Sequence, residues 1–328
     1  MLENTVLLIG LGTNKYKLDE IIKVESKQQI EEKYGVDSCF FKAYSVTTDF
    51  NKNNHEVYIL NIDSWEHIKK HKEILEELNF EYIVPLDLYI DDNYYDRYYQ
   101  KYLTYSQLIL LTIHRTISTI IMTGSYAQEY ETLDDFLEKE TDRIDKVRFR
   151  FENLRKEGLI YVANIISGNR YANMILALIL CNTDYGNYPK MEEKTRLIFE
   201  IDYSDMENNN IVYFKNNYLT GITIENLLNF SGNKTTRLIP VHKIIKYFYF
   251  HKANFDQFIG QSYTEYRKLK IREELMKFLD SLVGWIIYKY KITSMNVTSS
   301  EYGSVDIQIT YDIWPKFTTE KYTIETSI

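Results

Sequence analysis

Proline, cysteine and long apolar runs are scarce in this chain of 328 residues, which has four prolines and two cysteines. Cys39 and Cys181 both stand in apolar sequence, so we expect buried, reduced thiols in a protein made in the cytosol. The apolar run at 174–181 is far too short to cross a bilayer. Residues 1–4 carry no basic side chain before the first apolar run, so neither a secretory signal nor membrane insertion is expected.

A net basic charge is also lacking, because the formal net charge is −8 at pH 7. This balance argues against a general nucleic-acid binder, so no nucleic-acid partner is expected. Hydrophobic residues form 45% of the chain and charged residues are interspersed, which is typical of a globular protein. The length allows a large core and predicts about two domains.

Complete catalytic and cofactor motifs are missing as well. Gly10-Leu11-Gly12 follows an apolar run, as a dinucleotide-binding loop would, but Lys15 occupies the place of the third glycine. A Gly-Lys-Ser/Thr phosphate loop does not occur. One alternative therefore stays open: a nucleotide-binding α/β enzyme that uses the turn from Gly10 to Gly12.

Two histidines, His67 and His71, stand four residues apart on an expected helix and could share one face. Zinc would need a third ligand, and the sequence marks none. Lysines interleave the two histidines, so a solvated helix face is the simpler interpretation. We expect no catalytic residue, no metal site and no cofactor, and hence a protein that is not an enzyme.

Strands and helices alternate along residues 1–189, which predicts an α/β domain. Expected strands are 5–9, 55–62, 80–86, 118–123 and 158–165, with 80–86 central. Expected helices are 23–34, 40–49, 64–79, 98–114, 132–153 and 171–181. Ser26 is a plausible cap of the first helix, with Gln29 three residues on and Gly35 at its end.

Residues 190–303 predict a second, α+β domain. Short strands are expected at 197–201, 211–215 and 221–223, then a helix at 240–250 and a long helix at 263–288. The fold class is therefore α/β plus α+β, followed by an extended strand arm at 304–328.

The arm is recognised by alternation of apolar and polar residues, which marks a half-buried strand. Its apolar positions are Val305, Ile307, Ile309, Tyr311, Ile313, Tyr322 and Ile324. Pro315 fits a break between two runs. Two interpretations stay open: an ordinary edge strand of the chain's own sheet, or a tail donated to another subunit.

One charge pattern stands out, because residues 233–255 contain no acid in a chain of net charge −8. The stretch contains Lys234, Lys243 and Lys246, and the later helix adds Arg267, Lys268, Lys270 and Arg272. These cations are either a chance cluster on a solvated face or a strip that meets an acidic partner.

Several stretches resemble the tail sheath proteins of contractile phage tails and related injection machines. In the N-terminal half the similar stretches are 6–12, 24–30, 33–35, 56–60, 75–86 and 171–189; in the C-terminal half they are 244–290 and 305–324. Sheath subunits usually carry an N-terminal arm before the first strand, whereas only residues 1–4 precede Thr5 here. Two alternatives follow from this departure: the mesh of subunits uses fewer strands per joint, or the chain is a related sheath-fold component that caps or starts the tube.

The resemblance implies a subunit that polymerises helically with itself around an inner tail tube protein and contracts to drive the tube through the host envelope. It implies further contacts with baseplate and tail terminator proteins, a place in a virion tail, and synthesis in a bacterial host cytoplasm. The arm would join subunits, and the cations named above would contact the tube. Contraction would draw on free energy stored at assembly, without a cofactor or hydrolysis.

Overall fold

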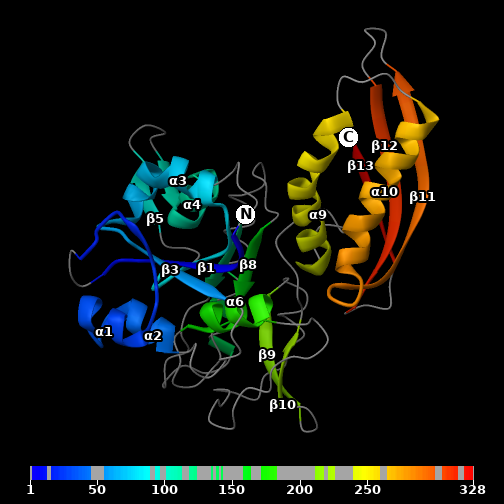
Figure 1. The fold of residues 1–328 in the computed structure, drawn as a ribbon. Coiled ribbons are helices and arrows are strands. Elements are labelled where there is room, and N and C mark those ends of the chain that lie inside the picture. Colours follow the sequence, from blue (N-terminus) through cyan, green and yellow to red (C-terminus); the bar gives the residue numbers. More distant parts are fainter. Residues whose placement is uncertain are drawn as a thin grey trace. The chain divides into compact units, whose positions relative to one another are not determined.

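The computed structural model describes residues 2–12, 16–45, 55–88, 93–96, 101–112, 118–123, 134–135, 138–139, 142, 158–163, 171–182, 211–217, 221–225, 239–258, 264–299, 305–316 and 321–327. Two compact units divide the chain (Figure 1). The first comprises Met1–Thr183 and Tyr188–Gly232, and the second comprises Asp184–Asn187 and Asn233–Ile328.

This division differs from the boundary that the sequence predicted at residue 189. Strands β9 (Tyr213–Asn217) and β10 (Gly221–Glu225) pair with each other, and the residue before β9 reaches the main sheet of the first unit. The Val212 N–H donates to the Tyr161 carbonyl at 2.9 Å, and the Ala163 N–H donates to the Val212 carbonyl at 2.9 Å. These bonds attach the segment to the first unit.

The main sheet of the first unit has six strands in the order β2-β3-β1-β4-β7-β8. Their bounds are β1 Leu2–Gly10, β2 Ile21–Lys23, β3 Glu56–Asn61, β4 Phe80–Pro85, β7 Thr119–Thr123 and β8 Leu159–Val162. Only β2 runs antiparallel to its neighbour. The five strands expected in this part of the sequence are confirmed, and so is the interior position of β4.

The central strands are apolar without alternation, because a parallel sheet is covered on both faces. Val6, Leu7, Leu8 and Ile9 are all fully buried in β1. Burial of a side chain of this size contributes about 1.5–3 kcal/mol, so these strands form the centre of the core. Figure 1 shows α3 and α4 on one side of the sheet and α1, α2 and α6 on the other.

The helices of the first unit are α1 Lys27–Tyr34, α2 Cys39–Ser45, η2 Trp65–His71, α3 Lys72–Leu78, α4 Tyr105–Thr112 and α6 Ala172–Asn182. The predicted cap of α1 is confirmed. The Gln29 N–H donates to Ser26 Oγ at 3.1 Å, and Gln29 Oε1 accepts from the Glu25 N–H at 2.8 Å. Gly35 ends the helix with φ 84°, a value that favours glycine.

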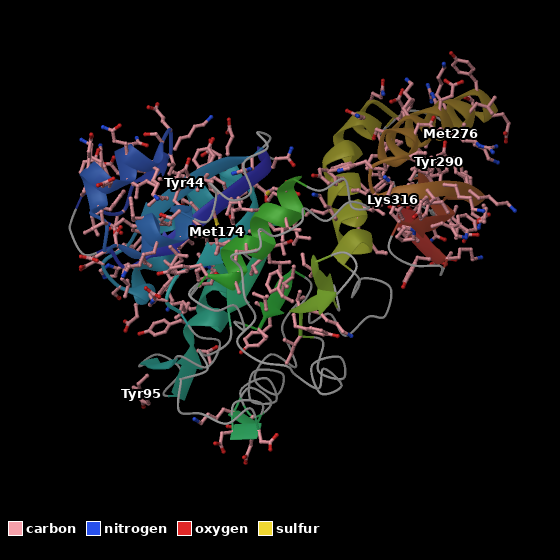
Figure 2. All side chains as sticks on the ribbon, turned by 90° about the horizontal axis from the view of Figure 1, so that it is seen from below. Tyr44, Tyr95, Met174, Met276, Tyr290 and Lys316 are labelled. Atoms are coloured by element: carbon pink, nitrogen blue, oxygen red, sulfur yellow. The ribbon has the colours of Figure 1, made fainter. Side chains whose placement is uncertain are left out.

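Three expected elements differ from the structure or lie largely outside the described residues. The helix expected at 98–114 is confirmed over α4, from Tyr105 to Thr112, but it was wrong at 101–104, where β6 (Lys101–Thr104) forms a hairpin with β5 (Asn93–Asp96). Tyr95 of this hairpin lies at the margin of the first unit and is exposed (Figure 2). The strand expected at 197–201 and most of the helix expected at 132–153 lie outside the described residues.

The second unit contains α9 Ile239–His251, η3 Lys252–Phe258 and α10 Glu265–Leu282, followed by three strands. The strands β11 Ile287–Ser299, β12 Val305–Pro315 and β13 Tyr322–Ser327 form an antiparallel sheet in that order. Helix α10 ends at Leu282, before the end that the sequence predicted at residue 288. Gly284 follows the helix with φ 85°. Within the described ranges, no helix combines the length and hydropathy that a membrane span requires.

Candidate functional site

The glycine turn after β1 is filled by the chain's own side chains. Gly12 N–H donates to Asn61 Oδ1 at 2.8 Å, and Asn61 Nδ2 donates to the Tyr16 carbonyl at 3.1 Å. A Cβ at Gly12 would lie 2.5 Å from Asn61 Oδ1, and one at Gly10 would lie 2.9 Å from Cys39 Sγ. The glycines thus admit close packing within the chain.

A dinucleotide loop also requires a helix that begins at the turn, since the helix N-terminus binds the phosphates. Here β2 comes between the turn and α1, which begins only at Lys27. The Gly12 N–H that would face a phosphate already has a partner. These features argue against the nucleotide-binding alternative.

The two histidines do not form a metal site. His71 is buried and its Nε2 lies 3.1 Å from Asp19 Oδ1, whereas His67 is partly exposed. Among the described residues, no group of three or more His, Cys, Asp or Glu side chains is placed to hold a metal ion.

Helix α10 presents the exposed part of the predicted cationic set. Thr264 caps it, because Thr264 Oγ1 accepts from the Arg267 N–H at 3.2 Å. Its buried side is apolar: Ile271, Leu275, Phe278, Leu279 and Leu282. Arg272 is exposed on the opposite side, and Arg267, Lys268 and Lys270 are partly exposed.

The charges of α10 are unevenly distributed. Every cation except Lys277 precedes Glu273, and Glu273, Glu274 and Asp280 occupy the second half. A helix is stabilised by anions near its N-terminus and cations near its C-terminus, so this arrangement gains little from the macrodipole.

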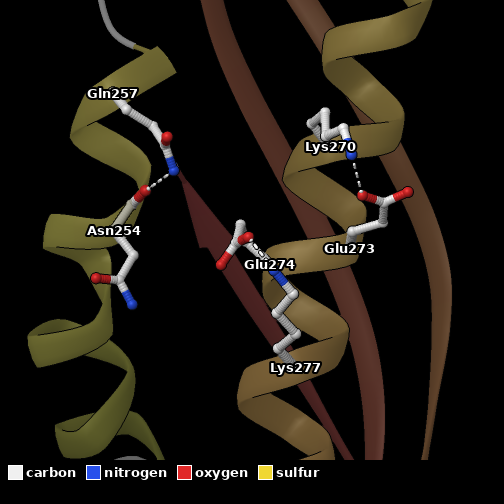
Figure 3. Close-up of polar contacts among 6 residues, drawn as sticks. All are labelled: Asn254, Gln257, Lys270, Glu273, Glu274 and Lys277. Atoms are coloured by element: carbon white, nitrogen blue, oxygen red, sulfur yellow. Dashed lines mark hydrogen bonds and ion pairs between the residues drawn. The ribbon is translucent and has the colours of Figure 1, made fainter.

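Two ion pairs balance part of this charge (Figure 3). Lys270 Nζ lies 2.8 Å from Glu273 Oε2, and Lys277 Nζ lies 2.6 Å from Glu274 Oε1. Lys268 and Arg272 form no ion pair with any side chain in the described ranges. These two are the cations of α10 most available to a partner.

The lysines predicted on α9 are not exposed. Lys243 and Lys246 are each 3% exposed. Lys243 Nζ lies 5.0 Å from the ring centre of Trp285 and 5.6 Å from that of Tyr247, so aromatic faces of the same unit receive this cation. Lys234 lies outside the described residues. A basic strip that includes Lys243 and Lys246 therefore does not exist at the surface of this chain.

Apolar side chains are also exposed along α10, and the sequence analysis did not single them out. Tyr266, Leu269 and Met276 are 69%, 56% and 39% exposed, and they follow a three- and seven-residue spacing on one side of the helix. Figure 2 labels Met276 in this unit. The sequence shows the spacing of these three residues, but it does not show that their side chains are exposed.

The predicted arm is only partly an arm. Its first run is β12, the middle strand of the chain's own sheet, so both edges of β12 are already paired. The predicted alternation is confirmed, since Ile307, Ile309, Tyr311 and Ile313 are buried. Alternation shows that a strand is half-buried, but it does not show which strands pair with it. One neighbour of β12 is β11, a strand that the sequence analysis did not predict.

The last strand, β13, is different because it is an edge. It pairs with β12 from Gln308↔Ser327 to Ile313↔Tyr322, and its other edge meets no strand of the described residues. Ile324 is buried, whereas Tyr322 is partly exposed.

Side-chain hydrogen bonds also join β13 to β12, on the face of the sheet opposite the buried isoleucines of β12. Asp312 of β12 is 5% exposed, and its Oδ1 accepts a hydrogen bond from Thr323 Oγ1 at 2.7 Å. Lys321 Nζ donates to Asp312 Oδ2 at 3.1 Å. The Thr323 hydroxyl, followed by the Lys321 ammonium, holds the pKa of the Asp312 carboxyl below its usual range.

By sequence, the chain matches no protein-family model and no curated protein. By structure, it has the fold of tail sheath proteins from contractile tails and injection systems. The resemblance found in the sequence is thereby confirmed as a resemblance of fold.

Three solved structures illustrate the match. The sheath tail protein of Desulfitobacterium hafniense has a TM-score of 0.62 at 9% identity, with 99% of this chain and 96% of that chain covered. The contracted PVC sheath of an extracellular contractile injection system gives 0.61 at 10% identity, covering 98% and 87%. The contracted helical sheath of the anti-feeding prophage gives 0.60 at 8% identity, covering 98% and 92%.

Proposed function

We propose that the chain is a structural subunit of a contractile tail sheath, which polymerises helically around an inner tail tube and contracts to drive the tube through a host envelope. The observation that supports this most is the fold match with sheath proteins, which extends over 98–99% of the chain. A match that includes both units argues for the complete sheath architecture and against a single borrowed domain.

Contraction in this proposal uses no cofactor and no hydrolysis. The extended array is metastable, and new contacts between subunits release free energy as each subunit moves outward. Joints between neighbouring subunits keep the array connected. The strand β13, with Tyr322 and Ile324, supplies this joint by pairing with a neighbour's sheet.

The second unit forms the inner layer, and the exposed cations of α10 contact the tube. Of the cations that the sequence predicted at the tube, this proposal retains Arg267, Lys268, Lys270 and Arg272. Lys243 and Lys246 are left out because both are buried. The first unit, with its acidic stretch at 129–142, forms the outer layer. Contacts between exposed charges are weak and screened by salt, which suits a sheath that must release the tube.

The partners are the subunit itself, the inner tail tube protein, and the baseplate and tail terminator proteins. The location is a virion tail or a phage-tail-like particle, after synthesis in a bacterial cytoplasm. A cap or initiator of the same fold is the second candidate. Unlike a sheath subunit, a cap or initiator forms a single ring, because it stops or starts the helical polymer.

Electron microscopy of the purified protein, alone and with its inner tube protein, tests the proposal. A sheath subunit forms helical tubes or decorates the inner tube along its length. A cap or initiator forms rings at tube ends. Monodisperse particles under all assembly conditions would contradict both.

Charge reversal on α10 tests the tube contact. We expect Lys268→Glu with Arg272→Glu to weaken co-sedimentation with the inner tube at low salt, and the difference from wild type to shrink as salt screens the charges. Lys277→Glu, compared with Lys268→Glu alone, is the matched control, since each reverses one cation of the same helix and Lys277 lies in the acidic half. Equal co-sedimentation of both variants would remove α10 from the interface.

A further inference from the structure

Helix α10 carries an apolar stripe on the side that faces away from its core. The stripe consists of Tyr266, Leu269 and Met276, and Tyr266, the most exposed of the three, has 69% of its surface open to solvent. A helix that packs on one side of a domain needs one apolar side, and α10 already buries another set of apolar residues against the second unit. Apolar side chains that adjoin one another at a surface mark a contact with another molecule, whereas single ones do not.

The spacing of the stripe is that of a seam between two helices. Leu269 follows Tyr266 by three residues and Met276 follows Leu269 by seven, so the three occupy a and d positions of a heptad pattern. The same pattern places Glu273 between Leu269 and Met276, and Asp280 after Met276. Because two positions of the seam are acidic, the helix that fits it must bring a cation to them.

The charges beside the stripe define which helix fits. The first half of α10, up to Arg272, has four cations and one acid, and the second half, from Glu273, has three acids and one cation. A second α10 that runs antiparallel sets each half against the half of opposite sign, whereas a parallel one sets like charges together. The surface of α10 is therefore complementary to itself under a two-fold axis, as a symmetric dimer requires.

We propose that free subunits pair through an antiparallel contact between the α10 helices of two copies, with Met276 beside the two-fold axis. This pairing goes beyond the proposed function, and only its consequence rests on that function. A subunit whose α10 is covered by a second copy cannot offer the same helix to the inner tube. The tube and the second copy then compete for α10, and pairing restrains assembly until a tube is present.

The heptad positions give the register of the pair. In an antiparallel seam, an a position of one helix lies opposite a d position of the other. Tyr266 then meets Val283 of the second copy, an exposed residue that directly follows the helix. Leu269 meets Asp280 of the second copy, and Lys270, next to Leu269, brings its ammonium to that carboxylate. By symmetry each of these contacts occurs twice.

The charged groups of this register have capacity for a further partner. Lys270 Nζ lies 2.8 Å from Glu273 Oε2 of its own chain, but the two side chains are 44% and 54% exposed, so a second carboxylate can approach the ammonium (Figure 3). Asp280 is exposed and accepts from Tyr290 Oη through Oδ1. Exposed ion pairs contribute little free energy, so they select the orientation while the apolar stripe supplies the affinity.

Velocity sedimentation of the full chain measures the pairing, because it separates monomer, dimer and tube. Wild type should shift from monomer toward dimer as its concentration rises. We expect Leu269→Asp to raise the dissociation constant of the dimer by about tenfold or more, since the pair receives the new charge twice. Val36→Asp is the matched control, because Val36 is 50% exposed, as Leu269 is 56%, but belongs to the first unit.

A charge swap tests the antiparallel register. Lys270→Glu and Asp280→Lys should each weaken pairing of the variant with itself, because positions 270 and 280 then carry like charges. An equal mixture of the two variants should pair as wild type does, since both contacts of the mixed dimer join opposite charges. Tyr290→Phe controls for the hydrogen bond that Asp280→Lys removes. A mixture that pairs as weakly as each variant alone contradicts the proposed register.

A single cysteine at the axis links the pairing to the tube. A short bismaleimide should join two Met276→Cys chains, and wild type, whose Cys39 and Cys181 are buried, gives the background. Assembled inner tube should lower the crosslinked fraction, because it competes for α10. A fraction that the tube leaves unchanged would retain the pairing and remove α10 from the tube contact.

The outcomes separate the pairing from the proposed function. Wild type that stays monomeric at every concentration, with no crosslink in Met276→Cys, overturns the pairing and leaves the sheath function intact. If Leu269→Asp loses tube binding but leaves the mass of the free protein unchanged, the stripe belongs to the tube contact and the pairing is overturned. Pairing in a protein that never forms tubes supports the inference and counts against the sheath.

Discussion

Tyr290 Oη donates a hydrogen bond to Asp280 Oδ1 at 2.7 Å and so joins strand β11 to helix α10. Figure 2 labels Tyr290 in the second unit. A second tyrosine of the same sheet, Tyr311, is fully buried, and its hydroxyl has no hydrogen-bond partner among the described residues. The two hydroxyl groups thus have opposite effects on stability.

Removing each hydroxyl in turn should separate these effects. We expect Tyr290→Phe to lower the free energy of unfolding of the second unit by about 0.5–1.5 kcal/mol, because a bond at the surface is lost. Tyr311→Phe should leave it unchanged or raise it by about 1 kcal/mol, since an unsatisfied polar atom leaves the core. Urea unfolding of the two variants measures both changes in the free energy of unfolding. Equal destabilisation by the two substitutions would contradict the opposite effects assigned to the two hydroxyl groups.

Alkaline pH should weaken the second unit through Tyr290. Burial, followed by the bond to Asp280, raises the pKa of Tyr290 from 10.0 to about 12. Between these values the folded protein keeps a proton that the unfolded chain releases, so stability is full below pH 10 and falls as pH rises through this window. The slope of stability against pH should be shallower in Tyr290→Phe than in wild type; identical slopes would contradict the prediction.

The turn after β1 offers a double-mutant cycle. Asn61→Ala leaves the Gly12 N–H and the Tyr16 carbonyl without the bonds that Asn61 makes, at a cost of about 1–3 kcal/mol. Gly12→Ala alone forces a Cβ against Asn61 Oδ1. We expect Gly12→Ala to cost less in the Asn61→Ala background, because the clashing atom is gone.

Chemical denaturation of the four proteins in this cycle measures the coupling. Asn296→Ala is a control, since Asn296 is an exposed amide in the other unit. Additive effects of Gly12→Ala and Asn61→Ala would show that the two positions do not contact each other. None of the variants should alter the assemblies that the protein forms in the microscopy experiment proposed above, because the turn serves the core of the first unit.

The sequence predicts the first sheet well because its signals are local. Apolar runs such as 5–9 and 80–86 are buried on both faces, and Ser26, Gln29 and Gly35 mark the ends of a helix directly. The hairpin of β5 and β6 was missed because tyrosine-rich residues before Tyr105 fit either a strand or a helix. Strand β11 was missed although its alternation from Ile287 to Val297 was readable, because the helical pattern of α10 was extended over Gly284.

The candidate surfaces depend on information that one sequence does not contain. Lys243 and Lys246 look like surface cations, and only the fold brings Trp285 and Tyr247 against Lys243. Alternation in β12 indicates burial equally well for a central strand and for an arm. The pairing of Asp312 with Thr323 joins positions eleven apart on two strands, and its register follows from the ladder.

Acid should release β13 before it unfolds the rest of the second unit. The pKa of Asp312 is held below its ordinary value of 3.8, chiefly by the hydroxyl of Thr323 and then by Lys321. The unfolded or undocked carboxyl therefore takes up a proton at a higher pH than the docked one. The stabilisation is present above pH 3.8 and is lost as pH falls through the lower, folded value.

Hydrogen exchange of the β13 amides measures this release, because exchange reports local opening. Protection of residues 322–327 should decline below pH 3.8, after correction for intrinsic exchange rates, while protection in β11 persists. Asp312→Asn should lower protection at neutral pH and remove most of the acid dependence, whereas Asp306→Asn should retain both. If β11 and β13 lose protection together in wild type, β13 is part of the same cooperative unit and does not open alone.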